Sequence, residues 1–388
     1  MTINVKNPQN TITFPGQAPR SPKLYTLQAF RGLAALYVLL FHTSGFVTVK
    51  ENYIFLFNIF NKGFLGVDFF FVLSGFIIYY AHKRDIGLSR QFPLYLKKRF
   101  LRVVPIFWIV LLPNLLAIWL LPQFTMGGVD SSLKGIICTI FLLPQSGVPI
   151  LGVSWTIKHE IFFYLIFGLS IILPKKISRP IITAWIFLTF LHLFRLEQLL
   201  LGQRYDYKLD FLFSFYNIEF CAGCLIAFLF IEKRIAITNF QSNSLIILSF
   251  ATMTFTGWAL TSQEIYFNEI LLVGLPFSLL LFGAAAKDFN VQKKPVSKIL
   301  LFLGDASYSI YLVHVPILSF SYKPIEYLGI NQALGPLLTT LLLLFLSSAG
   351  GCLLYVFIEK NLLSYLRKKF INEKNRESSA GKPCTSEP

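Results

Sequence analysis

Charged residues are scarce in this sequence. They make up 14% of its 388 residues, against roughly a quarter in soluble domains, whereas 55% of the residues are hydrophobic. The mean hydropathy is +0.62. Because a soluble fold of this size must cover its surface with polar groups, the composition excludes an ordinary soluble enzyme. We therefore expect a lipid bilayer to surround most of the chain.

Acidic residues and cysteines are also few. The net charge is +16, but the basic residues lie in short clusters between apolar runs, which is typical of topology signals rather than of a nucleic-acid surface. The five cysteines are odd in number and lie mostly in apolar runs, which argues against a disulfide framework. Cys221 and Cys224 form a CxxC whose apolar setting favours packing residues over a metal or redox site. The first 25 residues are polar, so no cleavable signal peptide is expected.

The apolar residues fall into ten runs, each long enough to cross a bilayer, which takes about 20 residues. The stretch 133–143 is too short and is expected to be interfacial or re-entrant. With a cytoplasmic N-terminus, this assignment puts most of the 35 Lys and Arg residues on the inner side. The sequence therefore predicts an all-α polytopic membrane bundle of about ten helices with both termini cytoplasmic. The runs are 29–48, 63–82, 101–121, 154–173, 180–196, 211–231, 244–260, 267–286, 299–320 and 333–358.

Three segments follow from this pattern. Residues 1–24 are predicted to be a cytoplasmic N-terminal segment, 25–362 the transmembrane domain, and 363–388 a cytoplasmic disordered tail rich in polar and charged residues. We find no internal repeat.

Ionisable side chains within spans are costly and point to function. Arg31 and His42 lie eleven residues apart in the first run, which places them on one helix face about 16 Å apart. Counting from the outer ends of the spans places four ionisable groups at one depth: His42, Asp68, Glu160 and His314. Glu219 lies slightly deeper. The inner edge carries Arg31, Arg99 and Arg102.

Structural interpretations compete with functional ones. A single polar group in a span can serve as an interhelical hydrogen bond, which is our interpretation of His159, His192 and Glu219 taken alone. The shared depth instead favours a common site for His42, Asp68 and Glu160. Arg99 and Arg102 fit an inside anchor as well as an anion site, although their i, i+3 spacing places both on one helix face and suits a phosphate.

These groups are the components of acyl transfer. An imidazole near a carboxylate can act as general base for a hydroxyl, or can itself carry an acyl group. The inner arginines could hold the phosphates of a cytoplasmic acyl carrier whose long flexible arm, as in coenzyme A, reaches the outer level. The residues alone allow this reaction without requiring it.

Five stretches resemble, in order and spacing from about residue 24 to 360, the acyltransferase-3 family of integral membrane acyltransferases. They read LYTLQAFRGLAALYVLLFHTSGF, GFLGVDFFFVLSGFIIYY, YLKKRFLRVVPIFW, SWTIKHEIFFYL and LGDASYSIYLVHVPIL. The resemblance implies a cytoplasmic acyl-CoA donor and O-acylation of sugars in surface polysaccharides, lipopolysaccharide, peptidoglycan or related glycans.

The family's functional residues map onto this sequence. The resemblance implies that His42 is catalytic and that Arg31, Arg99 and Arg102 bind the donor. Its acidic motif falls on Glu160 after Trp155, where Lys158 and His159 depart from the usual small or apolar residues and could alter acceptor preference. Its final signature, implied to support substrate or structure, comprises Ser307, Tyr308, Tyr311 and His314.

We therefore expect a multi-pass protein of the bacterial cytoplasmic (inner) membrane that moves an acetyl group from acetyl-CoA to a hydroxyl of a cell-surface or lipid-linked glycan. His42 is the expected base, oriented by Asp68 or Glu160. No metal and no nucleic acid are expected. Expected partners are membrane lipid, the glycan acceptor and a polysaccharide-assembly or acyl-relay protein, because no fused esterase-like domain is seen. The alternatives are a transporter or flippase of a glycan or lipid-linked intermediate, and an inactive scaffold.

Overall fold

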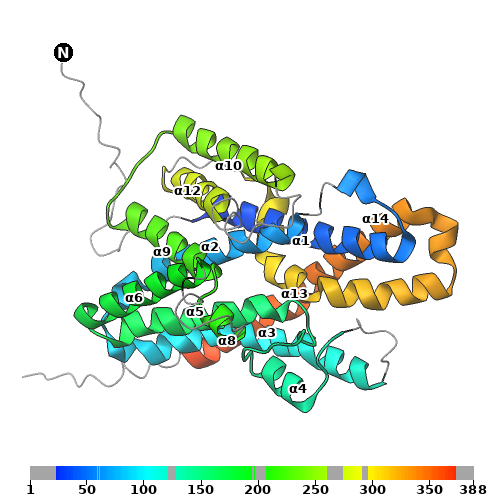
Figure 1. Ribbon diagram of the computed structural model, residues 1–388, viewed down its shortest axis with the longest axis horizontal. Coiled ribbons are helices and arrows are strands. Elements are labelled where there is room, and N and C mark those ends of the chain that lie inside the picture. Colours follow the sequence, from blue (N-terminus) through cyan, green and yellow to red (C-terminus); the bar gives the residue numbers. More distant parts are fainter. Residues whose placement is uncertain are drawn as a thin grey trace, which may run out of the picture.

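A computed structural model describes residues 23–58, 60, 62–120, 128–194, 196, 207–259, 274–290 and 296–372. These residues are mainly helical, and their only β interaction is an isolated bridge between Val129 and Val148. Figure 1 shows long helices lying side by side along the long axis of the molecule. The predicted all-α fold class is therefore confirmed.

Each of the ten predicted spans overlaps a helix, and seven helical segments of the described chain are long and apolar enough to cross a membrane. The chain is thus a polytopic membrane bundle, while the number of crossings and the side of the termini stay predictions. The stretch 133–143 forms only a short helix. The helices are α1 (Tyr25–Glu51), α2 (Gly66–His82), α3 (Phe92–Leu120), α4 (Leu133–Ile140), α5 (Ser154–Ile172), α6 (Lys175–Leu193), α8 (Tyr207–Leu212), α9 (Tyr216–Ile231), α10 (Asn239–Ala259), α12 (Leu275–Phe289), α13 (Lys298–Tyr327), α14 (Ile330–Leu354) and α15 (Lys360–Arg367).

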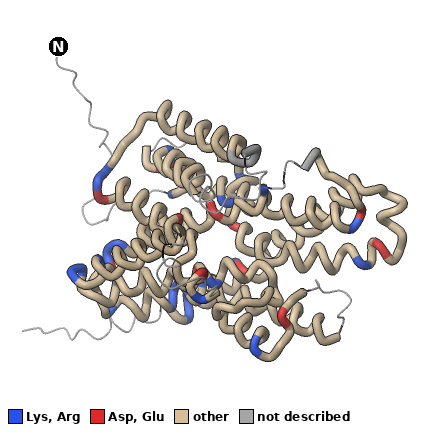
Figure 2. The backbone as a smooth tube through the Cα atoms, in the orientation of Figure 1, with Lys and Arg blue, Asp and Glu red and all other residues tan. Residues whose placement is uncertain are grey.

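Helices suit this sequence because a bilayer offers no hydrogen bonds to the backbone. Figure 2 shows that charged residues lie mainly at the ends of helices, with a few near the centre of the bundle. The start of α1 is held from another helix, since the Asp288 carboxylate in α12 accepts hydrogen bonds from the backbone N–H groups of Thr26 (2.8 Å) and Leu27 (3.0 Å). This tertiary N-cap fixes the helix that carries Arg31 and His42.

Glycines let α1 and α13 pack with their backbones in contact. A Cβ atom added at Gly304 would lie 2.1 Å from the carbonyl oxygen of Gln28, and one at Gly32 would lie 2.8 Å from the Gly304 nitrogen. Such small-residue contacts replace the hydrophobic driving force that is missing between helices in lipid. Further along the same pair, His42 meets His314, so the two helices run parallel.

The parallel arrangement constrains topology. If α1 and α13 both cross the membrane, an odd number of crossings must separate them. The seven runs predicted between them satisfy this condition.

The C-terminal end remains helical beyond the predicted transmembrane domain. A π-helical turn at Tyr355–Glu359 leads into α15, and a second one covers Lys368–Asn372. The Lys97 ammonium lies 4.9 Å from the centre of the Phe370 ring, which packs this end against α3. The first part of the segment predicted as a disordered tail is therefore helical, and the rest of it, 373–388, lies outside the described residues, as does 1–22 of the predicted N-terminal segment.

Candidate functional site

A cavity of about 220 Å³ lies where α1, α2, α3, α5 and α13 meet, and we call it the arginine cavity. The helix faces that line it carry all three arginines predicted at the inner edge. Arg99 and Arg102 come from one face of α3, and Arg31 comes from α1. Residues separated by about 70 positions in sequence thus converge on one space.

The three guanidinium groups differ in their partners. Arg102 Nη1 lies 3.1 Å from Glu359 Oε1. Arg99 stacks its guanidinium 5.9 Å from the centre of the Tyr164 ring, and its buried Nε has no hydrogen-bond acceptor among the described residues. Arg31 makes no hydrogen bond or ion pair within the described chain and faces the cavity. Two arginines therefore keep donors available, which suits an anion with several oxygen atoms.

Glu160 also faces the arginine cavity. Its Oε1 accepts a 2.5 Å hydrogen bond from the Tyr164 hydroxyl. Ser307 and Tyr308 of the family signature on α13 also line this cavity, where Ser307 donates to the Gly304 carbonyl (2.9 Å) and Tyr308 donates to the Val103 carbonyl (2.8 Å). The Tyr308 bond ties α13 to α3.

A second cavity, of about 380 Å³, contains His42 and is called here the histidine cavity. Its lining is mainly apolar, with Asn114 and Ser319 as further polar residues, and Trp155 contributes at the start of α5. Its rim includes the bridge between Val129 and Val148. Both side-chain and backbone hydrogen bonds from Ser132 lower the pKa of neighbouring Asp130, which lies outside the spans, and so support this loop.

His42 is paired with His314. His314 Nδ1 lies 2.6 Å from the Tyr311 carbonyl oxygen, which only accepts, so this nitrogen carries the proton and His314 Nε2 is an acceptor. His42 Nδ1 lies 3.1 Å from that Nε2 and 3.0 Å from the Val38 carbonyl oxygen, so it must be a donor. In the neutral ring, the lone pair of His42 therefore sits on Nε2, which has no hydrogen bond to the described residues. These tautomers are assigned from the hydrogen-bond partners.

The orienting partner of His42 differs from the sequence prediction. Within the described chain its hydrogen bonds go to Val38 and His314, whereas Glu160 lies in the arginine cavity and Asp68 interacts with Glu219 on α9. The correction has a simple cause: similar depth along several helices does not mean that their side chains face one another. Direct catalytic roles for Asp68 and Glu160 stay predictions.

Lys158 and His159, the two departures from the family pattern, line neither cavity. Buried Lys158 donates to Gln145 Oε1 at 2.6 Å. His159 is packed among aromatic rings and stacks on Phe211 with 4.4 Å between ring centres. Both are built into the packing at the start of α5.

Glu359 belongs to the site but is missed by the sequence reasoning. It is fully buried, and accepts hydrogen bonds from Ser309 Oγ (2.6 Å) and Arg102 Nη1 (3.1 Å). The residue follows the last apolar run directly and so resembles an ordinary membrane-edge charge. The π-helical turn changes the helical register there and directs Glu359 into the bundle.

Comparison with known proteins identifies the family of this chain. The family described as an acyltransferase domain matches residues 24–356, so the chain belongs to the acyltransferase-3 family. It is a multi-pass membrane acyltransferase.

A curated relative narrows the comparison. Over 322 residues the chain is 27% identical to the exopolysaccharide production protein ExoZ of Rhizobium meliloti (strain 1021), a match that covers 78% of this chain and 90% of that protein. No solved structure matches the chain.

Proposed function

We propose that the protein transfers an acetyl group from acetyl-CoA to a hydroxyl of an exopolysaccharide or its lipid-linked precursor in the bacterial inner membrane. One observation carries the proposal: a cavity with uncommitted arginines adjoins a second cavity that holds a histidine with an available lone pair. The name of the ExoZ relative, an exopolysaccharide production protein, supports a glycan as the acceptor.

The arginine cavity fits the phosphates of coenzyme A. Arg31 and Arg99 have available donors, and Arg102 is held in place by Glu359. Arginine binds phosphate oxygens with a planar, multidentate fork that lysine lacks. The predicted inward-facing ends of α1 and α3 would give the donor access from the cytoplasm.

His42 is suited to act as general base from the histidine cavity. Its Nε2 would accept the proton of the acceptor hydroxyl while the new C–O ester bond forms and the C–S thioester bond breaks. The protonated ring would then return that proton to the departing thiolate. His314 Nε2 accepts from His42 Nδ1 throughout, as the carboxylate does in a hydrolase triad.

The acceptor would enter the histidine cavity from the opposite side of the membrane. The apolar lining of that cavity suits the lipid part of a lipid-linked glycan, while His42, Asn114 and Ser319 offer polar groups to the sugar. A polysaccharide-assembly protein, or a relay protein that accepts the acyl group, would then be the functional partner.

Transfer of radiolabelled acetyl tests this function. The full-length protein in detergent is incubated with labelled acetyl-CoA and lipid-linked glycan extracted from cells lacking the gene. We expect label in the glycan that alkaline hydrolysis releases as acetate. Movement of the glycan across vesicle membranes without any acetyl transfer would instead support a flippase.

Arg102→Ala is expected to raise the Kd for acetyl-CoA by about 10- to 100-fold, the effect of losing one or two charge-assisted hydrogen bonds, with little change in KM for the acceptor. Arg102→Lys, which keeps a cation beside Glu359, should fall in between. Arg90→Ala is the control, because it removes an exposed arginine outside both cavities. Equal losses of donor and acceptor binding would indicate a structural anchor.

A further inference from the structure

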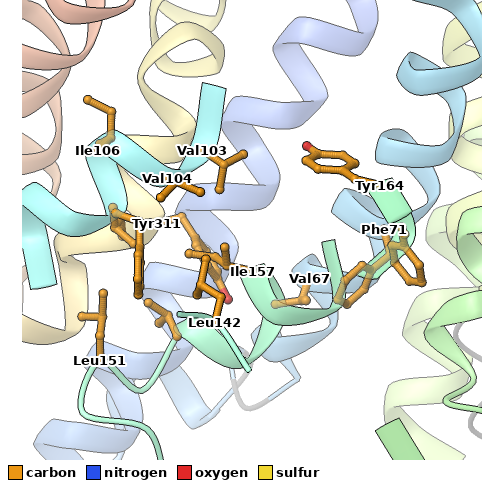
Figure 3. Close-up of a cluster of buried hydrophobic side chains, with 14 of the residues drawn as sticks. Val67, Phe71, Val103, Val104, Ile106, Leu142, Leu151, Ile157, Tyr164 and Tyr311 are labelled. Atoms are coloured by element: carbon orange, nitrogen blue, oxygen red, sulfur yellow. The ribbon is translucent and has the colours of Figure 1, made fainter. Parts of the chain in front are cut away.

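The two cavities share part of their lining. Val67 on α2 and Tyr311 on α13 border both the arginine cavity and the histidine cavity. Figure 3 shows both side chains within one cluster of buried apolar residues that also contains Val104 and Ile157. The two residues therefore form part of the wall between the spaces.

Tyr311 is fixed at both its ends. Thr156 donates its hydroxyl proton to the Val153 carbonyl (2.9 Å), so the 3.0 Å contact between hydroxyls is a hydrogen bond from Tyr311 to Thr156 Oγ1. The backbone carbonyl of Tyr311 accepts the bond that sets the His314 tautomer. Its ring centre lies 6.1 Å from that of Phe70, and the residue as a whole is only 8% exposed. The wall at Tyr311 is thus held by α5 and by the histidine pair.

The proposed reaction requires the acyl group to pass this wall. Arg31 and His42 are eleven residues apart on α1, or about 16 Å along the helix axis. Phosphates bound near Arg31 therefore leave the thioester to be carried towards His42 on a flexible arm. The reacting carbonyl must come within about 3 to 3.5 Å of the attacking oxygen, on the histidine side of Val67 and Tyr311.

We propose that Val67 and Tyr311 are specificity-determining residues, which form a constriction that selects short acyl groups on their way to His42. The inference rests on the proposed function and names a property that neither the family nor the relative's name supplies. Tyr311 takes part in hydrogen bonds that a substitution would remove. Val67 has only an apolar isopropyl group, so a substitution there changes the side-chain volume without removing a hydrogen bond. Acyl length should therefore respond to the volume at position 67.

Transfer of butyryl relative to acetyl measures the constriction. We expect Val67→Ala to raise the butyryl-to-acetyl ratio of kcat/KM about tenfold, the usual effect of one or two methylene groups in an apolar site. Val67→Ile should lower the same ratio, so the test survives if one variant folds poorly. Val104→Ala is the matched control, because Val104 is equally buried in the same cluster but lines neither cavity.

The outcomes separate this inference from the proposed function. If the wild-type protein transfers acetyl and both Val67 variants keep its butyryl-to-acetyl ratio, the proposed selection of acyl length at Val67 is contradicted, while the proposed acetyl transfer stands. The same conclusion follows if Val104→Ala changes the ratio as much as Val67→Ala. If the wild-type protein transfers neither group although it binds both thioesters, the proposed function fails.

Discussion

His42→Ala is expected to reduce acetyl transfer to the glycan by about 10²- to 10⁴-fold, the usual contribution of a general base. The Nε2 of His42 is the proton acceptor in the proposed reaction, and no other histidine of the described chain lines the histidine cavity. The rate is measured with labelled acetyl-CoA and extracted glycan, and the amount of folded protein in the membrane is measured in parallel.

Two controls make the His42 result specific. Acetyl-CoA binding should be unchanged, because His42 lines the histidine cavity and the donor phosphates bind at the arginine cavity. His192→Ala removes another histidine from a predicted span, one that pairs with Asp210 and lines neither cavity, and should transfer acetyl normally. Transfer by His42→Ala at the wild-type rate would contradict the assignment of the base.

His314→Phe is expected to lower kcat by about 10- to 100-fold, because it keeps a ring in place but removes the acceptor of the His42 Nδ1 proton. KM for acetyl-CoA should stay constant, since His314 acts through His42 as a positioning residue. His314→Gln, whose amide oxygen can accept a hydrogen bond, should restore part of the rate.

A merely structural role for His314 would give a different pattern. His314 is fully buried between α1 and α13, so loss of packing would lower the yield of folded protein in both variants. If total activity falls equally in His314→Phe and His314→Gln while kcat per folded molecule stays at the wild-type value, the imidazole of His314 serves only in packing.

The sequence predicts well those parts of the site that lie on a single helix. Arg31 and His42 share a face of α1, and Arg99 and Arg102 share a face of α3, because helical geometry alone fixes these relations. The all-α membrane bundle follows from composition and run length for the same reason. Each of these properties is set by residues close together in the sequence, so packing between helices is not needed to predict it.

Relations between helices could not be predicted in this way. Depth in the membrane can be counted along a helix, but the rotation of each helix depends on packing. Gly75 and Gly223 bring the backbones of α2 and α9 into contact, and this contact accompanies the pairing of Asp68 with Glu219 rather than with His42.

The partner of His42 has a similar origin. The contact of Gly32 with Gly304 sets the register of α1 against α13, and ten residues further along each helix this register brings His42 to His314. Glu359 depends on a π-helical turn, an irregularity that apolar periodicity does not reveal.

The sidedness of the reaction tests most directly whether donor and acceptor reach His42 from opposite sides. Inside-out and right-side-out membrane vesicles from cells producing the protein are given labelled acetyl-CoA, which does not cross the bilayer. We predict acetylated glycan only in inside-out vesicles, where the cytoplasmic face and the arginine cavity are accessible, and none with Arg102→Ala at low donor concentration. Equal labelling in sealed right-side-out vesicles would contradict donor entry through the arginine cavity.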